Sequence, residues 1–262
     1  MPIRMAECSQ LVAGASPRIS LFGCQVDNIS LQEAVQRVET FIEQGGTQRF
    51  FAVNVHKIVA FQHSPELRSI ANQSDLVTAD GQWIVWTSKW FGKPLKGRVN
   101  GTDLMECLVK LAVDKQYGIY LLGARPETLA VMVKHYQELY PGLKILGSRN
   151  GYWSPEEEGG IVHDIRQTRP QILFVGMSSP RKELFIDRNI QELQVPFVMG
   201  VGGSFDVVAG VTSRAPIWMQ RMGLEWFWRV LQEPGRMWKR YLLDGIRFSF
   251  IVIREWVSGS AL

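Results

Sequence analysis

The chain has 262 residues, of which 46% are hydrophobic and 21% charged, and this balance is typical of a folded globular protein and excludes a disordered one. Its three cysteines, Cys8, Cys24 and Cys107, are few and widely spaced, which excludes a disulfide framework and a CxxC zinc site and favours a reducing compartment. The formal net charge of +4 predicts an anionic partner, such as a phosphate, a nucleic acid or an acidic membrane surface.

The first part of the chain predicts a tail followed by a strand and a helix. Residues 1–18 have no sustained periodicity and no apolar signal segment, so we expect a loose tail. A strand is predicted over 19–27. The apolar residues of 31–44 recur at helical spacing, and Gly45 and Gly46 end that helix.

Short apolar runs then alternate with amphipathic segments. The predicted strands cover 49–55, 76–80, 117–123, 143–153, 171–177 and 196–203. The predicted helices cover 57–73, 101–116, 127–142, 159–170 and 182–193. Alternating strands and helices, with strands that are apolar on both faces, predict an α/β fold: a mostly parallel, Rossmann-like sheet with helices on both faces.

The composition changes near residue 214, where we place a domain boundary between an α/β core over 19–214 and a C-terminal helical appendage over 215–262. The appendage is basic and rich in tryptophan, and its arginines recur at intervals near seven. One interpretation is a helical hairpin that packs its tryptophans into the core. A second is an interfacial membrane helix. Nucleic acid ranks last, because no recognised nucleic-acid motif is present.

Polar residues that follow the predicted strands are the candidates for a ligand site, because ligands of parallel sheets bind beyond the carboxyl ends of the strands. Asp80 follows a strand and is either a general base or a helix cap. Asn54 is either a site residue or a turn residue. Arg98 stands before a helix start at 101–103, where an arginine and the helix dipole suit a diphosphate, although a surface role is equally open. No metal site is expected, since His56 and His63 lack a third ligand at a recognised spacing.

Seven blocks of sequence resemble, in order and spacing, the WecG/TagA/CpsF glycosyltransferases, glycosyltransferase family 26. The resemblance covers about residues 19–243. The blocks are NVHKIVAFQHSPELRSIANQSDLVTADG, GRVNGTDLMECL, LLGARPE, YPGLKILGSRNGYW, ILFVGMSSPRKE, GVGGSFDVVAG and RAPIWMQRMGLEWFWRVLQEPGRMWKRYL.

The resemblance implies an inverting, metal-independent transferase without a cofactor, which moves a hexose from a UDP-sugar to a sugar on a polyprenyl diphosphate. It implies a cytoplasmic protein, peripheral on an anionic membrane surface, with no nucleic-acid partner; the oligomeric state stays open, a homo-oligomer included. The family's general base falls on Asp80. The residues that it implies for binding the substrates are Asn54, Arg98, Tyr152, Lys182, Asp206, Arg229, Arg236, Lys239 and Arg240.

The chain departs from the family pattern at two positions near the substrates. Ala52 replaces a common threonine, and Lys182 replaces the glutamine of the P(K/R)QE block. These departures favour UDP-glucose as the donor, as in exopolysaccharide members, with an N-acetylmannosamine or N-acetylmannosaminuronate donor of the teichoic acid or common antigen type as the alternative. Two further alternatives are a nucleotide-binding oxidoreductase, which the missing GxGxxG motif disfavours, and a non-enzymatic peripheral membrane scaffold.

Overall fold

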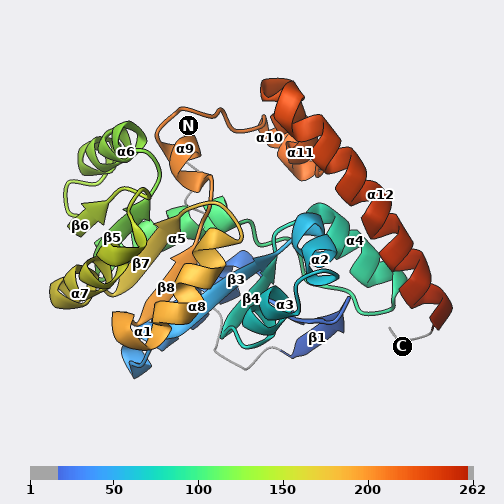
Figure 1. The fold of residues 1–262 in the computed structure, drawn as a ribbon, viewed down its shortest axis with the longest axis horizontal. Helices are drawn as coiled ribbons and strands as arrows, with labels where there is room; N and C mark the ends of the chain where they lie inside the picture. The colour runs from blue at the N-terminus through green and yellow to red at the C-terminus, as the bar shows by residue number, and fades with distance from the viewer. Residues whose placement is uncertain (1–16, 259–262) are drawn as a thin grey trace.

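The computed structural model describes residues 17–258, so residues 1–16 of the predicted tail lie outside it. At its centre is a six-stranded sheet with the order β4-β3-β8-β7-β5-β6, in which every neighbouring pair is parallel (Figure 1). Its strands are β3 (Gln48–Val53), β4 (Leu76–Ala79), β5 (Gly118–Gly123), β6 (Lys144–Arg149), β7 (Ile172–Gly176) and β8 (Phe197–Gly200). The predicted parallel α/β fold is confirmed.

Helices cover both faces of this sheet, which explains why β4, β5 and β7 are buried at every residue. Successive strand residues point to opposite faces. Phe50 and Phe174 pack on one face, and their neighbours Phe51 and Leu173 on the other. The first face is covered by α1 (Leu31–Gln44), α5 (Gly101–Asp114) and α6 (Pro126–Leu139). The second is covered by α2 (Val55–Phe61), α3 (Pro65–Asn72), α4 (Gln82–Trp90), α7 (Glu158–Thr168), preceded by the 3₁₀ turn η2 (Pro155–Glu157), and α8 (Arg181–Leu193).

Three local predictions were wrong. Residues 19–27 form no single strand but an antiparallel hairpin of β1 (Arg18–Leu21) and β2 (Cys24–Asp27), because Phe22 and Gly23 both adopt positive φ and make a two-residue turn. The predicted helix over 57–73 is split into α2 and α3, since the Ser64 hydroxyl caps a new helix that has proline at its first position. The helix α4 was not predicted.

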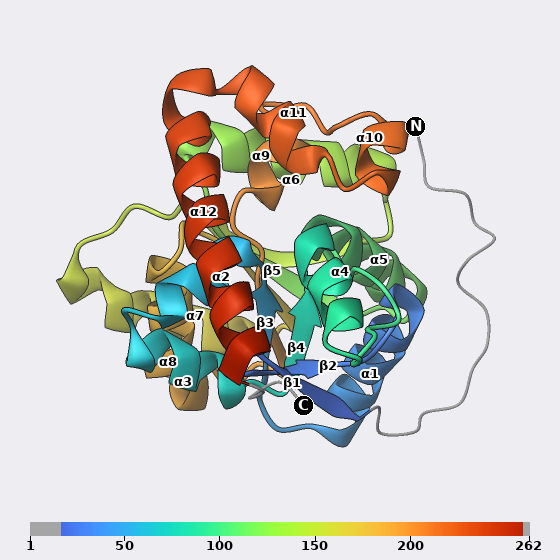
Figure 2. The ribbon, with the colours of Figure 1, turned by 90° about the vertical axis from the view of Figure 1, so that its right-hand side faces the viewer.

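The C-terminal segment forms helices, as expected. After β8 come α9 (Ser204–Val208), α10 (Ile217–Arg221), α11 (Glu225–Gln232) and α12 (Pro234–Ser258). Figures 1 and 2 show α9 to α11 at one end of the sheet and α12 running past α2 toward the β1-β2 hairpin. Among residues 17–258, no helix is long and apolar enough to cross a membrane.

One side of α12 belongs to the hydrophobic core. Phe248 and Ile251 are buried within the cluster that contains Phe22, Ile58 and Val85, and the Phe248 ring lies edge-on to Phe22 with centroids 5.2 Å apart. This packing anchors the appendage to the sheet through α2 and the hairpin. The residues of α12 that enter the core are therefore Phe248 and Ile251, whereas Trp238 and Trp256 are exposed, so the interpretation that packs the tryptophans into the core is wrong for these two residues.

Candidate functional site

Asn54 and Asp80 lie side by side because they follow adjacent parallel strands in register. Val53 pairs with Ala79, and the Asp80 amide donates to the Val53 carbonyl at 2.8 Å. The Asn54 side chain uses both of its ends: its oxygen accepts from the Lys57 amide at the start of α2, and its Nδ2 lies 3.5 Å from Asp80 Oδ2. Asn54 thus caps a helix and also contacts the candidate base.

The Asp80 carboxylate faces the start of α5. Its Oδ1 accepts from the Gly101 amide at 3.2 Å, at the first residue of that helix, where the helix dipole favours an anion. Burial nevertheless raises the pKa of Asp80, against the opposing effects of the Gly101 bond and the Arg229 charge. A carboxylate with a raised pKa is a stronger base, so Asp80 is suited to accept a proton.

Arg98 connects this end of the core to the appendage. Its guanidinium forms an ion pair with Glu225, the first residue of α11, and the side-chain Nδ2 of Asn100 donates to the same carboxylate at 3.4 Å. The side chain of Arg98 is only 14% exposed. The carboxylate that pairs with Arg98 thus belongs to the appendage, 127 residues further along the chain.

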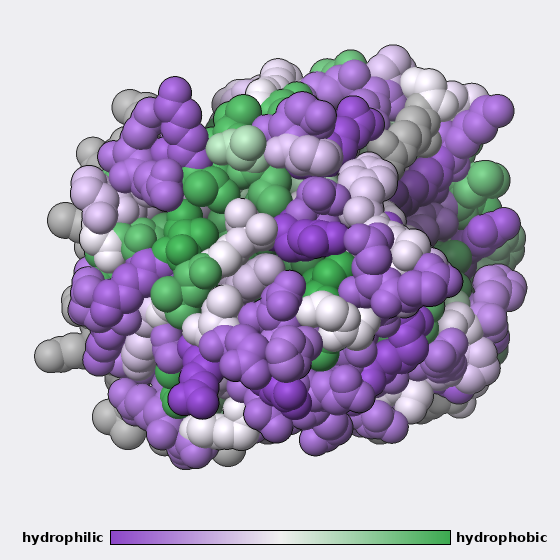
Figure 3. Space-filling model, turned by 60° about the vertical axis from the view of Figure 1, so that its left-hand side comes forward, coloured by the Kyte–Doolittle hydropathy of each residue, from purple (hydrophilic) through white to green (hydrophobic). Residues whose placement is uncertain are grey.

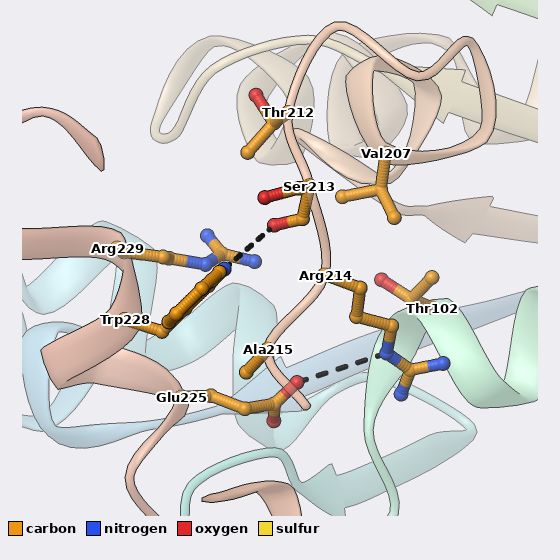
Figure 4. A pocket seen from close by; sticks show the side chains of 9 residues that line it. All are labelled: Thr102, Val207, Thr212, Ser213, Arg214, Ala215, Glu225, Trp228 and Arg229. Carbon is orange, nitrogen blue, oxygen red and sulfur yellow. Dashed lines mark hydrogen bonds and ion pairs between the residues drawn. The ribbon is translucent and has the colours of Figure 1, made fainter. Parts of the chain in front are cut away.

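Arg229 extends from the next turn of α11 into the same region. It lines a cavity with Thr102, Ser213 and Trp228, whose indole donates to the Ser213 carbonyl at 3.2 Å (Figure 4). The Arg229 charge lowers the pKa of Asp80, opposing the effect of burial. Arg229 and Arg98 therefore place positive charge close to the candidate base.

The other predicted basic residues of the appendage lie on α12. Burial lowers the pKa of His56, and the charge of the exposed Arg240 lowers it further, against the opposing effect of Asp244 of α12, 2.7 Å from the His56 Nδ1. Lys239 is exposed, with its Nζ 5.8 Å from the centroid of the Trp238 ring. The side chain of Arg236 lies outside the described part of the structure.

Lys182 belongs to a buried charge cluster. Glu183 accepts from Lys57 of α2 and lies 2.5 Å from Lys182 Nζ, so one carboxylate is shared by two ammonium groups. All three side chains are at most 12% exposed. Burial and the Lys182 charge lower the pKa of Lys57 to about 7. The second oxygen of Glu183 is buried without a hydrogen-bond partner.

Tyr152 and Asp206 lie at different places along the carboxyl edge. Tyr152 follows β6 at the opposite edge of the sheet from Asp80 and is 63% exposed. Asp206 lies on α9 after the central strand β8; α9 is anchored where Gly176, without a side chain, leaves room for the ring of Phe205. The structure thus groups Asn54, Asp80, Arg98 and Arg229, with Tyr152 remote from them.

Several charged residues of this region were not predicted from the sequence: Lys57, Glu183, Arg214, Glu225 and Asp244. All are held by partners distant in sequence, so no local pattern marks them. One signal was present at Lys182: a cation at a helix start conflicts with the helix dipole, and Glu183 offsets that conflict. Among the described residues, no three His, Cys, Asp or Glu side chains are placed to hold a metal ion.

The model of the glycosyl transferase WecG/TagA/CpsF family matches residues 19–261, which makes the chain a glycosyltransferase and hence an enzyme. The chain belongs to the WecG/TagA/CpsF family, as the resemblance predicted.

Two relatives carry the same descriptive name, N-acetylglucosaminyldiphosphoundecaprenol N-acetyl-beta-D-mannosaminyltransferase. The one from Staphylococcus aureus (strain MW2) is 30% identical over 226 residues, which cover 85% of this chain and 86% of the relative. The one from Bacillus spizizenii is 31% identical over 205 residues, which cover 78% of each protein. The similarity therefore extends over most of both chains.

Proposed function

We propose that the chain transfers a hexosyl group from a UDP-sugar to a sugar carried on polyprenyl diphosphate, with inversion at the anomeric carbon. The names of the relatives support this acceptor class and favour an N-acetylmannosaminyl donor over UDP-glucose. The donor preference inferred from Ala52 and Lys182 is revised accordingly. A cell-wall polymer is also favoured over an exopolysaccharide as the product.

The placement of Asp80 is the observation that carries the proposal. As the acceptor hydroxyl attacks C1 of the donor sugar, the new O–C1 bond forms and the bond from C1 to the diphosphate oxygen breaks. The proton of the hydroxyl passes to the Asp80 carboxylate, and the electron pair of the broken bond leaves with UDP. A raised pKa increases the base strength of Asp80, and a positioned base of this kind contributes about 10²–10⁴-fold to the rate.

Positive charge near Asp80 supports the departure of UDP. Arg98 and Arg229 adjoin the amino end of α5, and such groups stabilise a developing phosphate charge without a metal. Family membership adds Arg236, Lys239 and Arg240 as candidates for the diphosphate of the acceptor. We propose that these cations act when the membrane-bound acceptor approaches the appendage.

The donor is proposed to lie along the carboxyl edge of the sheet. Lys182 and Asn54 would adjoin the sugar, while Asp206 and Tyr152 would contact the uridine. Five inter-strand spacings separate β4 from β6, which amounts to about 24 Å at about 4.8 Å each, so Tyr152 could reach only the nucleoside end of the donor.

The appendage is proposed to bind the membrane surface that carries the acceptor. Most of the exposed large apolar side chains among the described residues belong to α10, α11 and α12, including Trp218, Phe250 and Trp256, which are 59%, 69% and 71% exposed. Arg240, Arg247 and Arg254 recur every seven residues along α12 and so form one basic line. By contrast, the face on the side of α6 and α7 is mainly hydrophilic, with a smaller hydrophobic area (Figure 3).

A transfer assay with the purified full chain tests the proposal. The acceptor is a short-chain polyprenyl diphosphate bearing N-acetylglucosamine, and the donors are UDP-N-acetylmannosamine, its uronate and UDP-glucose. We expect the fastest transfer from the N-acetylmannosaminyl donor, unaffected by EDTA. Absence of transfer from every UDP-sugar, together with absence of UDP binding, would favour the membrane scaffold.

A further inference from the structure

Arg98 and Arg214 come from separate segments and meet at the same carboxylate. Arg98 pairs with Oε2 of Glu225. Arg214 Nε lies 3.8 Å from Oε1 of the same group (Figure 4). Each oxygen of Glu225 therefore faces one guanidinium. Arginine binds phosphate groups through the same charge-assisted, often bidentate hydrogen bonds that it forms with carboxylates.

The surroundings of this pair are those of an anion site. The cavity beside Glu225 is lined by Thr102 in the first turn of α5, by Ser213 and by Arg229, which follows Glu225 by one turn of α11. Two guanidinium groups, those of Arg214 and Arg229, and the positive end of a 14-residue helix thus adjoin one polar cavity, and Arg98 contacts the Glu225 carboxylate that lines it. Glu225 supplies a single negative charge to this space.

Arg214 is held independently of Glu225. Its Nη2 donates to Asp103 of α5 at 2.5 Å, and its side chain lines the cavity and is 25% exposed. Arg214 would therefore keep its place if Glu225 moved away. Arg98, in contrast, would lose its ion pair and require another anion.

We infer that Arg98 and Arg214 are the two arms of a diphosphate site, and that Glu225 occupies this site until the diphosphate of a substrate displaces it. The identity of the ligand rests on the proposed function; the site itself rests on the contacts described above. A diphosphate carries two phosphate groups, so it can meet Arg98, Arg214 and Arg229 together, whereas one carboxylate cannot.

Calorimetric binding to the full chain tests the inference without the transfer reaction. The ligands are inorganic pyrophosphate, UDP and a short-chain polyprenyl diphosphate. We expect Glu225→Gln to bind pyrophosphate at least about fivefold more tightly, because the competing charge is gone, and Arg214→Ala to bind it about tenfold more weakly. Glu192→Gln, the same change at an exposed position on α8, is the control and should bind as the parent does.

Two results would contradict the proposed diphosphate site. Unchanged or weaker pyrophosphate binding by Glu225→Gln would show that Glu225 only orients the arginines, and unchanged binding by Arg214→Ala would remove Arg214 from the site. If Glu225→Gln lowers the melting temperature strongly, Glu225→Asp, which withdraws the carboxylate by one methylene, replaces it with the same expectation. Tighter binding of UDP assigns the site to the donor, and tighter binding of polyprenyl diphosphate alone assigns it to the acceptor. The expected pyrophosphate affinities of the Glu225 and Arg214 variants do not depend on whether any UDP-sugar is a donor.

Discussion

Lys57 is a buried lysine whose protonation is coupled to folding. Burial and the Lys182 charge lower its pKa from 10.5 to about 7, although Glu183 opposes them. Between about pH 7 and 10.5 the unfolded chain therefore binds a proton at this residue that the folded chain does not. Because the unfolded state binds more protons in this window, the contribution of Lys57 to the free energy of unfolding rises with pH.

The first prediction follows from the direction of this pH dependence. Between pH 7 and pH 10, the free energy of unfolding of the parent should rise relative to that of Lys57→Met, and below about pH 7 the difference should become constant. Denaturant unfolding at several pH values measures it. Lys134→Met, at a residue of α6 that is 78% exposed, controls for the loss of one charge. A difference that falls between pH 7 and pH 10 would contradict the assignment.

The second prediction concerns donor choice at Lys182. Its side chain is 12% exposed and paired with Glu183, so Lys182→Gln changes a buried charge beside the site and not a surface loop. We expect the ratio of kcat/KM for UDP-N-acetylmannosamine to that for UDP-glucose to change by about tenfold or more, the scale of one charged hydrogen bond.

Arg181→Gln is the matched control for Lys182. Arg181 is the neighbouring cation but is exposed, and its guanidinium lies 4.7 Å from the centroid of the Trp153 ring. Its substitution should leave the donor ratio unchanged. If Lys182→Gln and Arg181→Gln give the same donor ratio as the parent, Lys182 does not contact the donor sugar.

Prediction from the sequence succeeded at residues that follow strands and failed at residues held by distant partners. Asn54 and Asp80 were predictable because the carboxyl ends of parallel strands share one edge of the sheet. Glu225 and Glu183 were not, since each is assigned by contacts with residues more than 100 positions away. The raised pKa of Asp80 likewise depends on burial that no local pattern reveals.

At the scale of elements, the strands and most helices follow from periodicity, whereas turns and element ends do not. Phe22 has positive φ without being glycine, so its hairpin turn carried only the weak signal of Gly23. The orientation of α12 could not be predicted from the sequence either, because both of its sides contain large apolar residues. Its buried side packs on α2 and the hairpin, and its other side is exposed.

The third prediction compares the two sides of α12. Phe248→Ala should destabilise the fold by about 3–5 kcal/mol, because it removes a ring that is 5% exposed and packed on Phe22. Phe250→Ala, two residues along and 69% exposed, should change stability by at most about 0.5 kcal/mol. Denaturant unfolding of both variants measures the contrast. Equal effects would contradict the described orientation of α12.

For the whole molecule, the core and the appendage depend on one another. A cut near Ala215 would remove Phe248 and Ile251 from the cluster that also holds α2, so we expect such a fragment to expose apolar core. Point substitutions on the exposed side of α12 are the better test of membrane binding, since they leave this packing intact.

The fourth prediction concerns that binding. Phe250→Ala combined with Trp256→Ala should weaken binding to anionic vesicles by at least about tenfold, because burial of each ring in the interface contributes about 1.5–3 kcal/mol. Added salt should weaken binding further through the basic line of α12. Vesicle sedimentation measures both effects. Val131→Ala with Leu139→Ala, at exposed positions of α6, is the control; equal loss in both pairs would point to nonspecific adsorption.

The measurement that tests the central claim most directly is the turnover of Asp80→Asn in the transfer assay, combined with its affinity for UDP. Asparagine keeps the shape of the side chain and removes the base, and it also removes a partly buried charge, so the fold should be retained. We predict that kcat falls at least about a hundredfold while the Kd for UDP stays within a few-fold of the parent value. Turnover near that of the parent would contradict the assignment of Asp80 as the general base.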